Sequence, residues 1–146
     1  MIRINRQTDY AIRVLLALAN RSGEQRVPTA VIQSEMLIPP VFAQRIVAKL
    51  AHNGFIITYP GRDGGMQLAR PPRQINLRQV VEAFEGEILL SDCLSGEVEC
   101  PFDRKCPVRC HWVSLQKSLL NQMEKITFEE LASQTDPIEL PIEAVV

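Results

Sequence analysis

The 146-residue sequence lacks any apolar run approaching the roughly 18 residues that a membrane span requires. Its first residues, MIRINRQTDY, also lack the apolar core of a signal peptide. It has only two histidines, and no phosphate-cradling glycine loop or Ser/His/Asp arrangement is visible. These absences argue against a membrane protein and against an enzyme, and they predict a cytoplasmic protein.

Charge is nearly balanced overall, with a formal net charge of −1, but it is unevenly distributed along the chain. Residues 1–75 carry ten basic side chains against four acidic ones, whereas the remaining residues carry six against thirteen. A basic N-terminal half indicates contact with a polyanion such as DNA, which the acidic half would not share. Chance segregation of solvated charge is the alternative explanation.

Three helices are predicted in the basic half. The first spans residues 9–20, with apolar positions at helical spacing and Thr8 as its N-cap. A second, short helix is expected at 28–36, and a third follows at 40–53, where Gly54 ends it. Two helices joined by a tight turn are the outline of a helix-turn-helix.

The third helix has two distinct faces. Its inward positions are Ala43, Ile46, Val47 and Leu50. Its outward positions are Val41, Gln44, Arg45 and Ala48. A small, polar and basic face suits the major groove, because glutamine and arginine can hydrogen-bond base edges. Three further DNA-binding candidates flank this face: Lys49, which is placed to reach a phosphate, and Thr29 and Pro40, at the helix starts. A plain solvated face is the alternative.

A two-stranded hairpin is predicted after the third helix. Residues 55–59 are β-branched and aromatic, the turn PGRDGG follows, and residues 66–68 alternate in polarity. Such a wing places Arg62, at its tip, against the DNA backbone or in the minor groove, and Tyr59 is a second candidate contact. A simple surface hairpin is the alternative.

The acidic half is predicted to contain further helices. Asn76 can cap a helix at 77–85 that Gly86 ends, after an extended linker at 69–73. Residues 112–126 form a long helix whose apolar side chains must pack on the body or on a second subunit. A capping box at residues 127 and 130 begins another short helix, and the tail at 137–146 is expected to be irregular.

All four cysteines lie within 21 residues, at the spacing C-x6-C-x5-C-x3-C: Cys93, Cys100, Cys106 and Cys110. In the reducing cytoplasm, clustered cysteines are more often metal ligands or redox sensors than disulfides. Structural zinc sites favour cysteines two to four residues apart, which only Cys106 and Cys110 approach. The wider gaps favour an iron–sulfur cluster, while zinc and free or disulfide-bonded thiols are the alternatives.

Several of these segments together resemble the Rrf2 family of winged-helix transcription regulators, including its NsrR-, RirA- and IscR-like members. They are TDYAIR at 8–13, the wing through GRDGGMQLARP, INLRQVVEAFEGE at 75–87 and the DC…CP…CP segment. The resemblance implies a homodimer with a long C-terminal dimerisation helix and two recognition helices on a palindromic operator. It also implies a four-iron four-sulfur or two-iron two-sulfur cluster held by three cysteines.

The ligands carried over from the resemblance are Cys93, Cys100 and Cys106, with Asp9 reaching the cluster of the partner subunit. The sequence departs from the family pattern in having Cys110 next to His111, either of which is an alternative fourth ligand. It also has Pro60 where the wing commonly bears arginine, and glutamine at position 44 where another operator class has glutamate.

The sequence therefore predicts a mainly α fold with a small β-hairpin wing, made of a winged helix-turn-helix and a long C-terminal dimerisation helix. The expected divisions are a DNA-binding domain at 1–74 and a region at 75–146 that holds the cysteine loop (92–111) and the dimerisation helices. The predicted function is a repressor whose operator binding responds to nitric oxide, redox state or iron through the cluster. The rivals are a zinc-stabilised or cluster-free regulator and a small iron–sulfur electron carrier.

Overall fold

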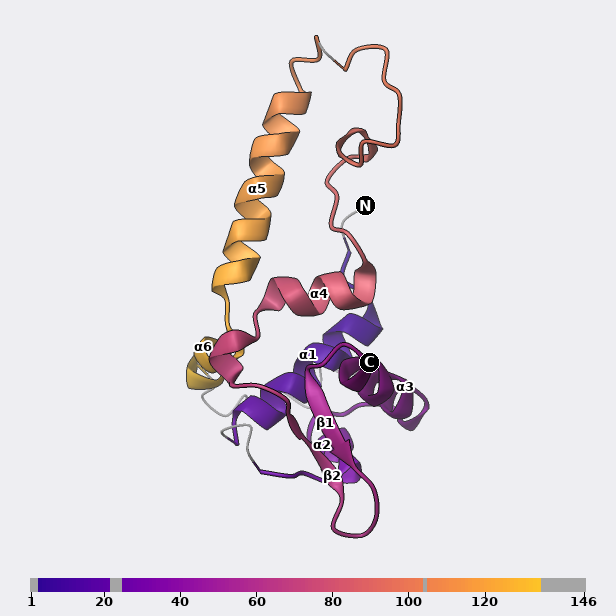
Figure 1. The fold of residues 1–146 in the computed structure, drawn as a ribbon, viewed down its shortest axis with the longest axis vertical. Coiled ribbons are helices and arrows are strands. Elements are labelled where there is room, and N and C mark those ends of the chain that lie inside the picture. Colours follow the sequence, from indigo (N-terminus) through magenta and orange to yellow (C-terminus); the bar gives the residue numbers. More distant parts are fainter. Residues whose placement is uncertain (1–2, 22–24, 104, 135–146) are drawn as a thin grey trace, which may run out of the picture.

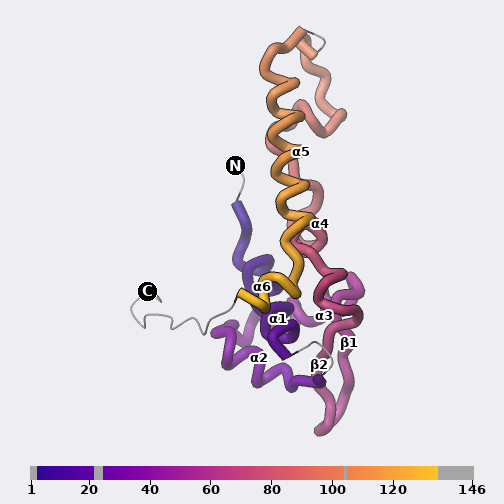
Figure 2. The backbone as a smooth tube through the Cα atoms, turned by 90° about the vertical axis from the view of Figure 1, so that its left-hand side faces the viewer, coloured from indigo at the N-terminus to yellow at the C-terminus, as the bar shows by residue number. Residues whose placement is uncertain are grey.

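The computed structural model describes residues 3–21, 25–103 and 105–134 of the chain. The described part is mostly helical with a two-stranded antiparallel hairpin, which confirms the predicted fold class. Figures 1 and 2 show a body that contains the N-terminal helices and the hairpin, and an elongated arm that rises from it. We define the body as residues 3–21, 25–85 and 126–134, and the arm as residues 86–103 and 105–125. The irregular tail predicted at 137–146 lies outside the described residues.

Helix α1 (Arg6–Ala19) forms the centre of the body, and it begins earlier than the sequence predicts. The N-cap is Asn5, whose side chain accepts a hydrogen bond of 2.9 Å from the backbone N–H of Thr8. The prediction that Thr8 caps the helix is therefore wrong. Thr8 lies inside the first turn and is fully buried, and its hydroxyl donates to Glu85 instead. Long-range burial thus overrides the local preference of threonine for cap positions.

The predicted helix-turn-helix is confirmed as α2 (Thr29–Glu35) followed by α3 (Pro40–His52). The turn between them includes Leu37 in a left-handed conformation, with a φ of 52°. Pro40 occupies the first position of α3, where its missing N–H costs no hydrogen bond. Of the four predicted inward positions of α3, Ala43, Ile46 and Leu50 are buried. Val47 is only half-buried, because it packs against the edge of the core and also lines the groove between α3 and the wing.

The predicted wing is confirmed as strands β1 (Ile56–Tyr59) and β2 (Gly65–Leu68), paired in antiparallel register with Ile56 opposite Leu68. The structure adds a bridge that the sequence does not reveal, because Val27 pairs with Met66 on the other edge of β2. A Cβ atom at Gly65 would lie 2.6 Å from the carbonyl oxygen of Val27. Glycine is therefore required there for this close approach.

The chain reaches the arm through η1 (Pro72–Gln74) and α4 (Leu77–Glu85), and it returns through α6 (Phe128–Gln134). Asn76 forms the predicted cap of α4, with a complete capping box. The Leu77 N–H donates to the carbonyl of Ile126, and the Phe128 N–H donates to the carbonyl of Ile75. Both hydrogen bonds are 2.9 Å long. Phe128 is fully buried in the same core as α1. That core therefore contains side chains from both of the predicted divisions, 1–74 and 75–146.

The arm contains η2 (Asp92–Leu94) and α5 (Arg109–Lys125), which run side by side in Figure 1. Helix α5 begins three residues before the predicted start, so Cys110 and His111 lie on its first turn. None of its 17 residues is buried. None of the described helices is both long enough and apolar enough to cross a membrane.

Arg78 links α4 to α5 at the base of the arm. Its guanidinium lies 3.0 Å from the Glu82 carboxylate and 3.1 Å from that of Glu124. The hydrogen bond to Glu82, supported by the charges of both carboxylates, raises the pKa of Arg78 above its ordinary value. The ion pair with Glu82 lies within α4, whereas the ion pair with Glu124 connects α4 to the lower end of α5.

Candidate DNA interface and cysteine segment

The outward face of α3 is exposed as the sequence predicts. Val41 is 78% exposed, and Gln44 and Arg45 are also exposed. Pro40 is exposed at the start of the same helix, while Thr29 is half-buried at the start of α2. The opposite side of α3 packs into the core of the body, and the outward face remains accessible to a ligand.

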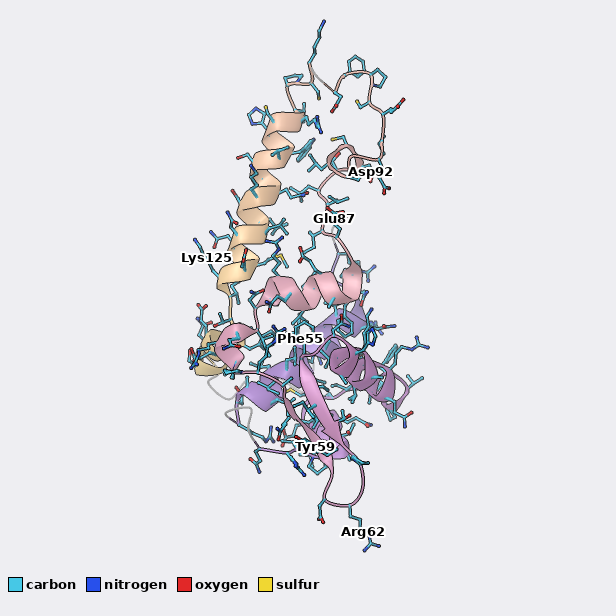
Figure 3. The ribbon with its side chains drawn as sticks, viewed as in Figure 1. Phe55, Tyr59, Arg62, Glu87, Asp92 and Lys125 are labelled. Atoms are coloured by element: carbon cyan, nitrogen blue, oxygen red, sulfur yellow. The ribbon has the colours of Figure 1, made fainter. Side chains whose placement is uncertain are left out.

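A groove of about 460 Å³ lies between α3 and the wing. It brings together four of the predicted DNA-binding residues, which are Thr29, Gln44, Tyr59 and Arg62. Figure 3 shows Arg62 at the tip of the hairpin, pointing away from the body. Val41, Arg45 and Pro40 lie on α3 outside the lining of this groove. A helix with a polar face beside a hairpin with an arginine tip can engage adjacent grooves of duplex DNA.

Lys49 lies differently from its neighbours on α3. Its ammonium donates a 3.3 Å hydrogen bond to the carbonyl of Phe84 and lies 4.7 Å from the centre of the Phe84 ring. The side chain is half-buried. The structure thus attaches Lys49 to the end of α4, and its predicted contact with a phosphate would require release of this hydrogen bond.

Arg26 is absent from the binding residues that the sequence predicts, yet it lies beside the wing. Its guanidinium carbon is 3.6 Å from the centre of the Tyr59 ring. No pattern in the sequence signals this contact, because Arg26 precedes the helix-turn-helix and its neighbour Val27 lies outside any run with strand character.

The four cysteines are free thiols on different local structures. Cys93 lies in η2 with its sulfur 3.2 Å from the Ser91 hydroxyl oxygen, and Cys100 and Cys106 are half-buried in irregular chain. Cys110 is exposed on α5, and its thiol donates a hydrogen bond of 3.2 Å to the carbonyl of Pro107. In the described part of the chain, no three His, Cys, Asp or Glu side chains are gathered to hold a metal ion.

The donor chemistry of this segment fits a thiolate-bound iron–sulfur cluster. Three half-buried thiols lie on chain that is irregular except for one 3₁₀ turn, so they can approach a common centre without unwinding a long helix. Arg109, which forms an ion pair with Asp103, has a buried Nε with no hydrogen-bond partner among the described residues. Arg109 precedes Cys110 in the sequence, and an unsatisfied N–H donor is the kind of group that stabilises sulfur acceptors.

Asp9, the ligand assigned to the partner's cluster by resemblance, forms an ion pair with Arg13 at 2.7 Å. Both side chains are roughly half-exposed, at 48% for Asp9 and 41% for Arg13. Arg13 also donates a hydrogen bond of 3.3 Å to the carbonyl of Met36, in the turn before α3. Asp9 is thus connected to the helix-turn-helix within its own chain. His111, the other candidate, is exposed on α5.

Glu85 forms a cluster of hydrogen bonds that the sequence does not reveal. Its Oε1 accepts from the Thr8 hydroxyl at 2.5 Å and from the Asn5 N–H at 2.9 Å, and its Oε2 accepts from the Asn5 side chain at 2.8 Å. Glu85 is the last residue of α4, just before the arm. One carboxylate therefore connects the start of the arm to the start of α1.

Comparison with known proteins places these features in context. Residues 4–134 match the Rrf2 family, described as iron-dependent transcriptional regulator. The protein aau3 of Rhizobium meliloti is 28% identical over 132 residues, covering 89% of this chain and 84% of the relative. The transcriptional regulator NsrR of Bacillus licheniformis is 25% identical over 138 residues, covering 94% and 96%. The structure of CymR, the global cysteine regulator of B. subtilis, has the same fold, with a TM-score of 0.78 at 24% identity over 93% and 100% of the two chains.

Proposed function

This chain belongs to the Rrf2 family of transcriptional regulators, and from that premise we propose that it is a repressor that binds operator DNA as a homodimer under the control of an iron–sulfur cluster. Its relatives regulate transcription, and the family is not enzymatic. The observation that supports DNA binding is the groove between α3 and the wing, where Gln44 and Arg62 face the same space. In this arrangement α3 enters the major groove and Arg62 the adjacent minor groove.

The homodimer is supported by the apolar surface of the arm. Trp112 and Leu115 are 38% and 53% exposed on α5, which buries no residue in its own chain. An apolar groove of about 460 Å³ lies beside it between α1, α4 and α5. A second copy of α5 would cover both surfaces, as amphipathic helices do in dimers. Two-fold symmetry then presents two α3 helices to a palindromic operator.

The cluster would be held by Cys93, Cys100 and Cys106, with Asp9 of the other subunit or Cys110 as the fourth ligand. When bound, it supplies iron that reacts with nitric oxide, with oxidants or with chelators. The chain's own contribution is mechanical: ligation would fix the segment that follows Glu85, and Glu85 holds the first turn of α1. A shift of roughly 2 kcal/mol between two arrangements of the body would change operator affinity about thirtyfold.

A zinc-stabilised or cluster-free regulator is the second candidate. The cluster-free form is favoured by one observation, that the described cysteines are free thiols without three of them gathered around a common centre. A zinc site would need its ligands gathered just as a cluster would. CymR, which has the same fold, is named a cysteine regulator, so the shared fold alone does not select the signal. The two candidates differ in colour, in metal content and in their response to nitric oxide.

Anaerobic purification of the full chain, followed by a visible absorption spectrum and by iron, sulfide and zinc analysis, tests the cofactor. We expect a coloured protein with iron and sulfide. One zinc per chain, or no metal, in a colourless anaerobic preparation would contradict the proposal.

Operator binding tests the control. We expect affinity to fall after nitric oxide or chelator in the parent protein, and to be insensitive to both in a variant with Cys93, Cys100 and Cys106 changed to serine. Ser114→Ala, at an exposed position of α5 that is not a candidate ligand, is the matched control. Cys110→Ser separates the two candidate fourth ligands, because an unchanged response to nitric oxide would leave that role to Asp9 of the partner subunit. Equal affinity of the parent protein in all states would exclude control by the cluster.

A further inference from the structure

The backbone of Arg26 is fixed at the edge of the wing. Its neighbour Val27 pairs with Met66 of β2, through two hydrogen bonds of 2.9 Å each. Gly65, next to Met66, is in turn opposite Tyr59 of β1. The position of Arg26 is therefore set by the same sheet that positions Tyr59, although the two residues are far apart in the sequence.

The guanidinium of Arg26 forms a close cation–π contact with Tyr59, with 3.6 Å between its carbon and the ring centre. Such a contact occupies the face of the guanidinium and leaves the N–H groups at its edge free to donate. Tyr59 lines the groove between α3 and the wing, whereas Arg26 lies outside that lining, so the stacked guanidinium is held at the margin of the wing. A duplex that contacts the wing would therefore pass close to it.

The charge of Arg26 is not neutralised within the described chain. Two other arginines of the same half are paired with acids: Arg13 with Asp9 at 2.7 Å and Arg21 with Glu35 at 2.5 Å. Arg26 has no ion pair or hydrogen bond to an acid among the described residues, and it is exposed. A positive charge that is held in place and lacks an acidic partner is suited to an external anion.

We propose that Arg26 is a DNA phosphate contact, and that Tyr59 is the positioning residue that holds it, rather than a residue that reads bases. This inference rests on the proposed DNA binding and assigns part of it to a residue before the helix-turn-helix. An arginine can present two parallel N–H donors to one phosphate, which fixes the register of the protein on the duplex. The contact carries no sequence information, so it operates on any duplex.

The test measures binding of the full chain to a fluorescent duplex of about 30 base pairs of random sequence while salt is raised from about 50 to about 200 mM. Each phosphate contact contributes about 0.9 to the slope of log affinity against log salt, which is about a threefold change over this range. We expect Arg26→Ala to reduce the slope by about 0.9 per protomer. Arg73→Ala, which removes an exposed arginine of η1 rather than one stacked on the wing, is the matched control and should leave the slope unchanged.

Variants of Tyr59 separate positioning from direct contact. Tyr59→Phe keeps the ring, so its salt slope should equal that of the parent protein. Tyr59→Leu removes the ring without changing the net charge, so it should lower the salt slope by most of the amount that Arg26→Ala does. In a protein that already has Arg26→Ala, adding Tyr59→Leu should lower the slope almost no further. If the reductions in slope from the two single variants add in the double variant, Tyr59 does not act through Arg26. A Tyr59→Phe variant whose slope is as low as that of Tyr59→Leu would also contradict the positioning role. Circular dichroism melting confirms that each variant is folded.

The outcomes distinguish this inference from the proposed function. If the parent protein binds the duplex but Arg26→Ala has its full salt slope, Arg26 does not touch phosphate and the inference fails while DNA binding stands. The inference also fails if Arg73→Ala lowers the slope as much as Arg26→Ala does, because the effect would then reflect net charge. If the parent shows no salt-dependent binding to any duplex, the proposed function itself fails.

Discussion

The body and the arm differ in how much apolar surface they bury within one chain. The body has a continuous core in which Leu15, Ile46 and Phe128 are at most 1% exposed. The arm has no buried residue on α5, and Phe102 is 69% exposed in the cysteine segment. The body is thus stabilised by its own packing, whereas the arm has apolar surface that only another chain or a bound group can cover. Substitutions in the body should therefore lower the free energy of unfolding, whereas substitutions in the arm should weaken dimerisation.

Phe128→Ala tests whether the body depends on the returning C-terminal helix. The ring is fully buried against the core, so we expect a loss of about 3–5 kcal/mol in the free energy of unfolding. Phe102→Ala in the arm is the matched control, and it should change this free energy by less than about 0.5 kcal/mol. Urea denaturation monitored by circular dichroism measures both, and similar losses would show that the two regions do not differ as described.

Replacing both Trp112 and Leu115 with serine tests the assembly of the arm. We expect the dimer dissociation constant to rise at least about thirtyfold, because truncated hot-spot residues at an interface cost about 2 kcal/mol or more. Asn121→Ser, at an exposed polar position of the same helix, should leave dimerisation unchanged. Analytical ultracentrifugation gives the constants, and an unchanged monomer–dimer equilibrium in the double variant would place the interface elsewhere.

Glu85→Ala tests the connection between the two regions. It removes an acceptor shared by Asn5 and Thr8 and leaves the buried Thr8 hydroxyl without that partner, so we expect a stability loss of about 1–2 kcal/mol. Glu87→Ala, at an exposed position two residues further on, is the control. Chemical denaturation measures the loss. In the cluster-bound protein, Glu85→Ala should also narrow the difference in operator affinity before and after nitric oxide.

Lys49→Met tests a residue at the junction of α3 and α4. Because its ammonium donates to the Phe84 carbonyl, we expect a stability loss of at most about 1 kcal/mol and little change in the salt dependence of DNA binding. Arg45→Ala on the exposed face should instead lower the salt slope by about 0.9 per protomer. A Lys49→Met slope as low as that of Arg45→Ala would show that Lys49 leaves Phe84 to reach a phosphate.

The features that sequence alone could predict are those with a local signature. The helix-turn-helix follows from Pro40, Gly54 and the apolar spacing between them, and the wing follows from alternating residues around a glycine-rich turn. The Asn76 cap follows likewise from its capping box. These elements are specified by residues within a few positions of one another.

The features that sequence could not predict depend on partners far apart in the chain. Thr8 has the character of a cap, but its hydroxyl is used by Glu85, 77 residues away. Arg26 has no motif, and its role depends on a ring that the wing brings to it. The cysteine ligand set comes from resemblance rather than spacing, because an irregular segment can gather thiols in more than one way.

The hydrogen bonds between the residues before α4 and those after α5 have an evolutionary consequence. Asn76 and Thr127 form a bridge, so the start of α4 and the chain that follows α5 are held together in the body. The arm, which Figure 1 shows reaching far from the wing, is therefore joined to the body at both of its ends. In the proposed regulator, insertions, deletions or an exchange of the sensing chemistry near the tip of the arm would leave both of these ends in place. The same DNA-binding body could therefore be combined with arms of different sensing chemistry.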